Sequence, residues 1–108
     1  MADHHLESVS IHATQRLAQR NLTYRDIEYV LNHGRRIRNG KALFICLGLR
    51  DIPADDLRES NLRRLEGTVL VLDPISGSHL TTAYRNRRSG IRDVKRKHKR
   101  ALSPHYDA

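Results

Sequence analysis

The chain has 108 residues, which fits one domain, and its 38% hydrophobic content allows a small core. The formal net charge is +8, and the single cysteine, Cys46, excludes an internal disulfide and a cysteine-based zinc site. No apolar run resembles a signal peptide or approaches the ~18 residues of a membrane span, so we expect a cytoplasmic protein.

The first third of the chain is typical of two short helices. Ser10 can cap a helix over residues 11–20. Thr23 followed by Asp26 indicates a variant capping box, which opens a second helix that ends at His33-Gly34. Three residues at helical spacing give this second helix an apolar face: Ile27, Val30 and Leu31. The short connection between the helices predicts an αα-hairpin.

After residue 34, the spacing of apolar residues changes from that of helices to that of strands. Asn39-Gly40 predicts a two-residue hairpin loop, because a type I′ turn needs positive φ at both central residues. A charged, irregular stretch follows at residues 50–66, where Pro53 could begin a short helical turn. The expected strands are residues 36–38, 41–49, 68–72 and 79–85. This order predicts an α+β domain over residues 1–90, with the N-terminal αα-hairpin packed on a four-stranded antiparallel sheet.

Residues 85–100 carry almost all of the net charge, whereas the rest of the chain is neutral. Such a strip predicts contact with phosphates, and a solvated tail is the plain alternative. A membrane surface is disfavoured because the strip lacks Trp and Phe. Within the extension at 91–108, a helical stripe (Ile91, Val94, His98, Leu102) leaves a docked basic helix and a disordered tail equally open. The nine basic residues are Arg85, Arg87, Arg88, Arg92, Lys95, Arg96, Lys97, Lys99 and Arg100.

Two further groups of residues could carry chemistry. His12, Arg16 and Arg20 form one strip of the first helix, and the repulsion between the arginines calls for an acid or an anionic ligand. Pairing with Asp26 or Glu28 is the purely structural interpretation. In the last strand, alternation predicts one face with Leu80, Thr82 and Tyr84, and another with His79, Thr81, Ala83 and Arg85. The histidines show no spacing typical of a metal site.

Two motifs resemble a family of small bacterial domains of unknown function, related to the RelE, ParE and BrnT toxins. The run HATQRLAQRNLTYRDIEYVLNHG, residues 12–34, resembles the family's opening, and TAYR, residues 82–85, resembles its closing strand. The resemblance covers about residues 8–90. It implies helices on a four-stranded antiparallel sheet, with six residues converging on one face or edge: His12, Arg16, Arg20, Thr82, Tyr84 and Arg85. The stretch at 50–66 departs from the family and could cover that face.

The wider toxin group includes ribonucleases, so the resemblance implies an RNA-directed protein. For metal-independent cleavage without a cofactor, His12 or Tyr84 would transfer the proton while Arg16 and Arg85 stabilise the phosphate. Arg20, Thr82 and the basic strip would bind nucleic acid. The alternative is a non-enzymatic nucleic-acid-binding or regulatory module, and an antitoxin-like protein is a further expected partner.

Overall fold

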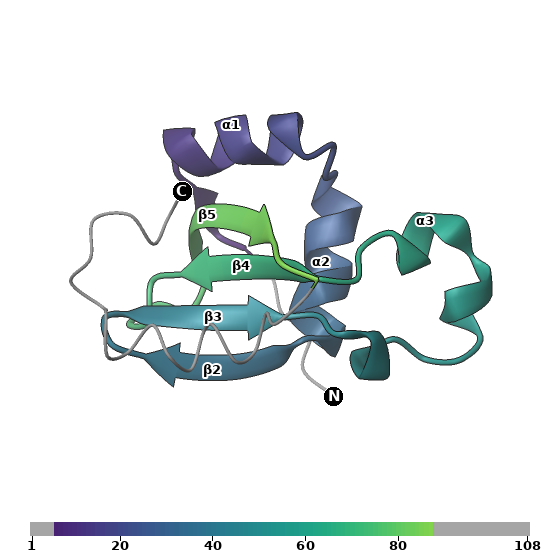
Figure 1. Ribbon diagram of the computed structural model, residues 1–108. Helices are drawn as coiled ribbons and strands as arrows, with labels where there is room; N and C mark the ends of the chain where they lie inside the picture. The colour runs from purple at the N-terminus through teal and green to yellow at the C-terminus, as the bar shows by residue number, and fades with distance from the viewer. Residues whose placement is uncertain (1–5, 88–108) are drawn as a thin grey trace.

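The computed structural model describes residues 6–87, which form a mixed α+β fold around one five-stranded sheet (Figure 1). The strands are β1 (Ser8–Val9), β2 (Arg35–Asn39), β3 (Ala42–Cys46), β4 (Thr68–Leu72) and β5 (His79–Arg85). The helices are α1 (Ile11–Gln19), α2 (Tyr24–His33) and α3 (Ser60–Arg63), with 3₁₀ turns η1 (Leu49–Asp51) and η2 (Asp56–Arg58). The strand order is β1-β5-β4-β3-β2.

The predicted α+β class is confirmed, but the sheet has a fifth strand. Strands β2 to β5 form the expected antiparallel meander, and β1 adds a short parallel strand beside β5. Ser8 lies opposite His79 in this pair, and the Glu7 amide donates to the Ser78 carbonyl at 2.8 Å. Two residues give no alternation pattern, so the sequence carries no signal for this strand.

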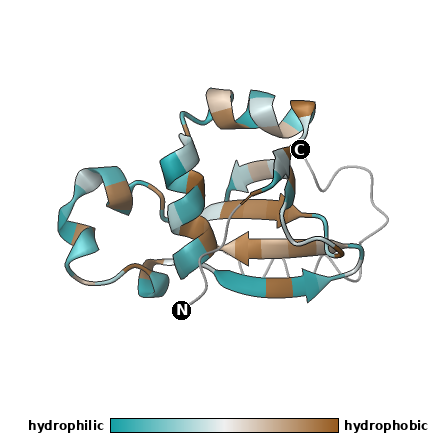
Figure 2. Ribbon diagram, turned by 180° about the vertical axis from the view of Figure 1, so that it is seen from behind, coloured by the Kyte–Doolittle hydropathy of each residue, from teal (hydrophilic) through white to brown (hydrophobic). Residues whose placement is uncertain are grey.

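Both helices begin at the predicted caps. The Ser10 hydroxyl accepts from the Ala13 amide at 2.9 Å, and Thr23 and Asp26 complete the capping box. The expected αα-hairpin is not formed, because α1 lies along β5 whereas α2 crosses the face of the sheet that is at the back in Figure 1 and at the front in Figure 2, where it contacts β3. Asn21, with φ of 56°, turns the chain sharply between them.

The hairpin between β2 and β3 is present, with its loop one residue later than predicted. Asn39 pairs with Ala42, so the loop residues are Gly40 and Lys41. Gly40 has φ of 63°, and it is the only residue of the loop with positive φ. A type II′ turn has this pattern, with glycine at the first central position, so the predicted type I′ turn at Asn39-Gly40 is corrected.

A β-bulge at the start of β5 decides which side chains face the helices. The register shifts between Val71 and Leu72, and the Thr81 hydroxyl donates to the Val71 carbonyl at 2.9 Å. Leu80 and Ala83 therefore share the face that packs on α1 and α2. Thr82 pairs with Val71 and points to the opposite face, so the prediction that it shares a face with Leu80 is wrong.

The irregular segment at 50–66 packs at the end of the sheet beside α2 (Figure 1). The Pro53 carbonyl accepts from the Asp56 amide at 2.9 Å, so the predicted helical turn is present there. Leu57, Leu62 and Leu65 pack on the core between sheet and helices. No helix within residues 6–87 combines the length and apolar character needed to cross a bilayer.

Candidate anion-binding site

Helix α1 and strand β5 run side by side in the same direction, which brings Arg20 level with Arg85. The Ser10 amide donates to the Leu80 carbonyl and its hydroxyl to the Thr81 carbonyl, both at 2.9 Å. From that anchor, ten residues of helix rise about 15 Å and five residues of strand about 16 Å. The helix therefore covers nearly the same distance in ten residues as the strand covers in five, so Arg20 and Arg85 lie at the same level.

Arg85 lies among three other guanidinium groups at this end. Burial, and then the charges of Arg87, Arg20 and Arg64, lower the pKa of the Arg85 guanidinium below its ordinary value. Arginine remains charged at any physiological pH, so the repulsion persists in the folded protein. We call these four residues the arginine cluster: Arg20, Arg64, Arg85 and Arg87.

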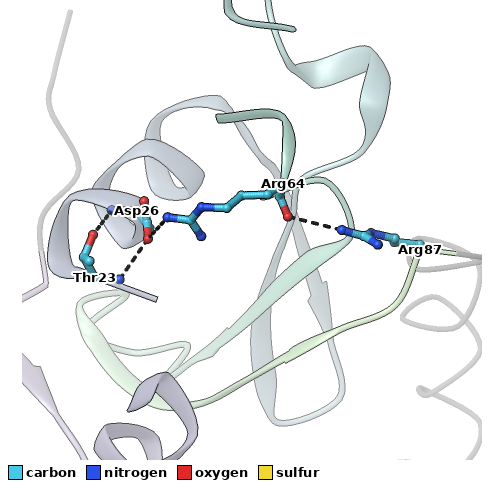
Figure 3. A network of polar contacts seen from close by, with 4 residues as sticks. All are labelled: Thr23, Asp26, Arg64 and Arg87. Atoms are coloured by element: carbon cyan, nitrogen blue, oxygen red, sulfur yellow. Dashed lines mark hydrogen bonds and ion pairs between the residues drawn. The ribbon is translucent and has the colours of Figure 1, made fainter. Parts of the chain in front are cut away.

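An ion pair to α2 holds Arg64 in place. Its guanidinium donates to the Asp26 carboxylate at 2.7 Å, and the same carboxylate oxygen accepts from the Thr23 amide at 2.9 Å (Figure 3). The capping carboxylate of α2 therefore also neutralises part of the cluster. The structural interpretation that Asp26 pairs with Arg16 or Arg20 is not what the structure shows.

Backbone contacts hold Arg87 against the loop before β4. Its guanidinium approaches the carbonyls of Arg64 and Glu66 at 3.4 Å, and the first of these contacts is drawn in Figure 3. Gly67 has φ of +87°, and a Cβ there would lie 2.6 Å from Cγ of Arg87. The chain can pass this closely only because residue 67 has no side chain.

Several buried polar atoms at this end have no hydrogen-bond partner within the described residues. They include Nε of Arg20, Nε of Arg85 and Oγ1 of Thr68, and Thr68 pairs with Arg85 across the sheet. An unsatisfied buried donor costs about 1–3 kcal/mol. An anion bound by the solvent-accessible parts of these guanidinium groups would reduce the repulsion among the four arginines.

The other predicted residues of the first helix, His12 and Arg16, lie nearer its N-terminus, away from the arginine cluster. His12 is exposed, and its Nε2 lies 3.5 Å from Nε of Arg16, which donates to it. Eight residues separate His12 from Arg20, which is about 12 Å along the helix axis. The prediction that His12 lies within one nucleotide's reach of Arg85 therefore does not fit this arrangement.

Thr82 and Tyr84 lie on the other face of the sheet. Tyr84 pairs with Val69 and packs against Phe44 and its neighbours, away from α1. The expected convergence of six residues on one face is therefore wrong for these two, because strand alternation sends Tyr84 and Arg85 to opposite sides. Their proposed roles with RNA stay predictions.

Sequence reasoning missed Arg64, which lies in a segment with no periodic pattern. The one signal available is the capping residue Asp26, a buried carboxylate that needs a counter-charge. The segment at 50–66 supplies that charge and so completes the cluster. Seven predicted basic residues lie outside the described residues: Arg88, Arg92, Lys95, Arg96, Lys97, Lys99 and Arg100.

Comparisons with protein-family models, with curated proteins and with solved structures gave no match. The resemblance to the toxin-related family therefore depends on the two quoted motifs alone.

Proposed function

We propose that this protein binds RNA and holds backbone phosphates in the arginine cluster. The observation that carries the proposal is the position of Arg85, half-buried among three guanidinium groups with its Nε unpartnered within the described residues. A stable fold has no need to gather four cations, so the cost of doing so is explained if a polyanion neutralises them.

Phosphate is the anion that this chemistry fits best. Guanidinium forks bind phosphate through paired, charge-assisted hydrogen bonds. The strip of His12, Arg16 and Arg20 extends about 12 Å from the cluster along α1, enough to follow several phosphates of one strand. The choice of RNA over DNA follows from the family resemblance. The basic residues beyond Arg87 would add attraction that depends on salt but not on sequence.

Binding of a fluorescent single-stranded RNA, measured by anisotropy over a range of salt concentrations, tests the proposal. Arg85→Ala should weaken binding about tenfold or more and reduce the salt slope by about 0.7, the value for one phosphate contact. Arg38→Ala is the matched control, because Arg38 is an exposed arginine on the far edge strand β2. If both variants bind as tightly as the parent, the cluster is not the RNA site.

A second candidate function is metal-independent RNA cleavage in a toxin-like role. The observation that favours it is the exposed His12, whose Nε2 lies 3.5 Å from Nε of Arg16, so that an imidazole lies beside a guanidinium able to hold a phosphate. Arg16 would then lie beside the scissile phosphate. The neighbouring ribose 2′-hydroxyl would give its proton to His12 as its oxygen attacks the phosphorus, and the 5′-oxygen of the next nucleotide would leave and take a proton from water. Tyr84 cannot assist His12 in this arrangement, because it faces the opposite side of the sheet.

Incubation of mixed RNA with the purified protein, with and without a chelator, tests cleavage directly. Cleavage should persist with the chelator and be lost in His12→Ala, while RNA binding by that variant stays within about twofold of the parent. Arrest of growth on expression, relieved by His12→Ala, would support the toxin-like role. Intact RNA after hours of incubation leaves the binding proposal alone.

A further inference from the structure

The arginine cluster carries more positive charge than one internal phosphate can neutralise. Among the described residues, Asp26 is the carboxylate that forms an ion pair with the cluster, so four cations and one carboxylate give a net charge of +3. In the same part of the chain, the charges that act on Arg85 are those of Arg87, Arg20 and Arg64, all positive. A phosphodiester inside an RNA strand brings a single negative charge. The cluster therefore suits an anion of higher charge.

Three separate parts of the chain gather these cations at one place. Arg64 donates to the Asp26 carboxylate at 2.7 Å, and Arg87 donates to the Arg64 carbonyl at 3.4 Å (Figure 3). Arg20 and Arg85 lie level with each other at the ends of α1 and β5. Because Asp26 compensates Arg64, three guanidinium groups of the cluster are left without an ion pair within the described residues: Arg20, Arg85 and Arg87.

The two sides of the cluster differ in charge. Along α1, the cationic strip continues to Arg16 and to the imidazole of His12, so internal phosphates of a strand can follow it. On the other side, the chain turns through residues 21–23 into α2, where the carboxylate of Asp26 contacts Arg64 (Figure 1). A carboxylate repels a further phosphate, so a strand that follows α1 gains little by continuing past the cluster. This polarity fits the end of a strand.

We propose that the arginine cluster binds the terminal phosphate of an RNA strand, which is a phosphate monoester. A monoester carries about −1.5 to −2 charge near pH 7 and presents three acceptor oxygens, more of both than an internal diester. Its three oxygens match the three uncompensated guanidinium groups, each of which can donate paired hydrogen bonds. This inference rests on the proposed binding of RNA, and it names the part of the RNA that the cluster takes.

RNA oligonucleotides of one sequence that differ only at their ends test the inference on the unmodified protein. With the fluorophore at an internal position, RNA with a terminal phosphate should bind about tenfold more tightly than RNA with hydroxyl groups at both ends. A phosphate at the 5′ end and one at the 3′ end are compared, which identifies the end that enters the cluster. The methyl ester of that terminal phosphate keeps the phosphorus in place but loses one charge and one free oxygen, so it should lose most of the gain.

Arg85→Ala should abolish the gain from the terminal phosphate, whereas Arg38→Ala, on the exposed edge strand β2, should keep it. Equal binding of phosphorylated and hydroxyl RNA by the parent overturns the inference, as does a methyl ester that binds as tightly as the phosphate. A gain that persists in Arg85→Ala overturns it too, because the added charge then acts outside the cluster.

The same titrations separate this inference from the proposed function. If the terminal phosphate adds nothing but Arg85→Ala still weakens the binding of every RNA, the inference fails and the proposed RNA binding stands. If Arg85→Ala changes the affinity for none of them, both fail.

Discussion

The two ends of α1 carry the same kind of side chain in different settings. At the beginning of the helix, His12 and Arg16 contact each other at 3.5 Å, with His12 exposed to solvent. At the end, the half-buried Arg20 and Arg85 lie near Arg64 and Arg87, which two other parts of the chain hold in place.

This difference assigns phosphate binding and proton transfer to opposite ends of the helix, whereas the sequence alone groups His12, Arg16 and Arg20 in one strip. A site that holds a phosphate gains from cations fixed in position before the ligand arrives, because less ordering is needed on binding. A proton-transfer group needs access to its substrate and to water. We therefore expect affinity to depend on the end of α1 and any chemistry to depend on its beginning.

The largest effect on stability is expected at Gly67, where the backbone passes close to Arg87. Gly67→Ala should lower the free energy of unfolding by about 2–3 kcal/mol, because a residue with a side chain resists φ of +87° and its Cβ meets Arg87. Gly77→Ala is the matched control: it has φ of +67°, and its nearest contact, Leu43, is 3.9 Å away. Urea unfolding should show a smaller loss for Gly77→Ala, and equal losses would contradict the close approach at Arg87.

The next effect compares the two ends of α1 directly. Arg20→Ala should weaken RNA binding about tenfold, or roughly 1.4 kcal/mol, whereas Arg16→Ala should weaken it only about twofold. Each variant removes one arginine, Arg16 from within α1 or Arg20 from its C-cap, so their net charges are identical. Anisotropy titrations at one fixed salt concentration measure the difference, and a stronger effect of Arg16→Ala would place the phosphate at the beginning of the helix.

Asp26→Asn should change stability and affinity in opposite directions. The variant loses an ion pair between the buried Asp26 and Arg64, whose side chain is 34% exposed, and the asparagine can still cap α2, so the free energy of unfolding should fall by about 1 kcal/mol. RNA binding should become about threefold tighter, because the cluster loses its neutralising charge. Asp51→Asn is the control: Asp51 also pairs with an arginine, Arg35, and accepts from a backbone amide, but away from the cluster. It should lose stability without any gain in affinity.

The smallest effect concerns the repulsion inside the cluster. Arg85→Met should raise the free energy of unfolding by about 0.5 kcal/mol, because it removes a half-buried cation and keeps an apolar stem of similar length. The same variant should bind RNA weakly. Thermal unfolding without RNA or phosphate measures the first effect, and a clear loss of stability would mean that Arg85 has an anionic partner within the protein.

Features set by neighbouring residues could be predicted from the sequence. Ser10 and the pair Thr23 and Asp26 cap their helices through atoms three residues away, so their patterns report the structure directly. The end of α2 at Gly34 was also predicted, but the reason for the glycine differs from the expected one. Gly34 has φ of −74°, and a Cβ there would lie 2.8 Å from Ile45, so close packing explains the glycine rather than a left-handed cap.

Features that depend on distant residues could not be predicted. Strand β1 exists only because β5 lies beside it, and the bulge at Thr81 is visible only in the pairing with β4. Arg64 joins the cluster through Asp26, 38 positions away. For the candidate site, Arg20 and Arg85 were named from the motifs, whereas their proximity follows from the anchor of Ser10 on Leu80 and Thr81, from which helix and strand rise by similar distances.

The parallel pairing of β1 with β5 sets the order in which the protein can be completed during translation. The N-terminal strand and α1 leave the ribosome first, yet the carbonyls that receive Ser10 belong to Leu80 and Thr81. Such long-range pairing forms late, because the intervening chain must be closed into a loop. A nascent chain that ends before residue 79 therefore carries Arg20 and Arg64 without the strand that gathers them.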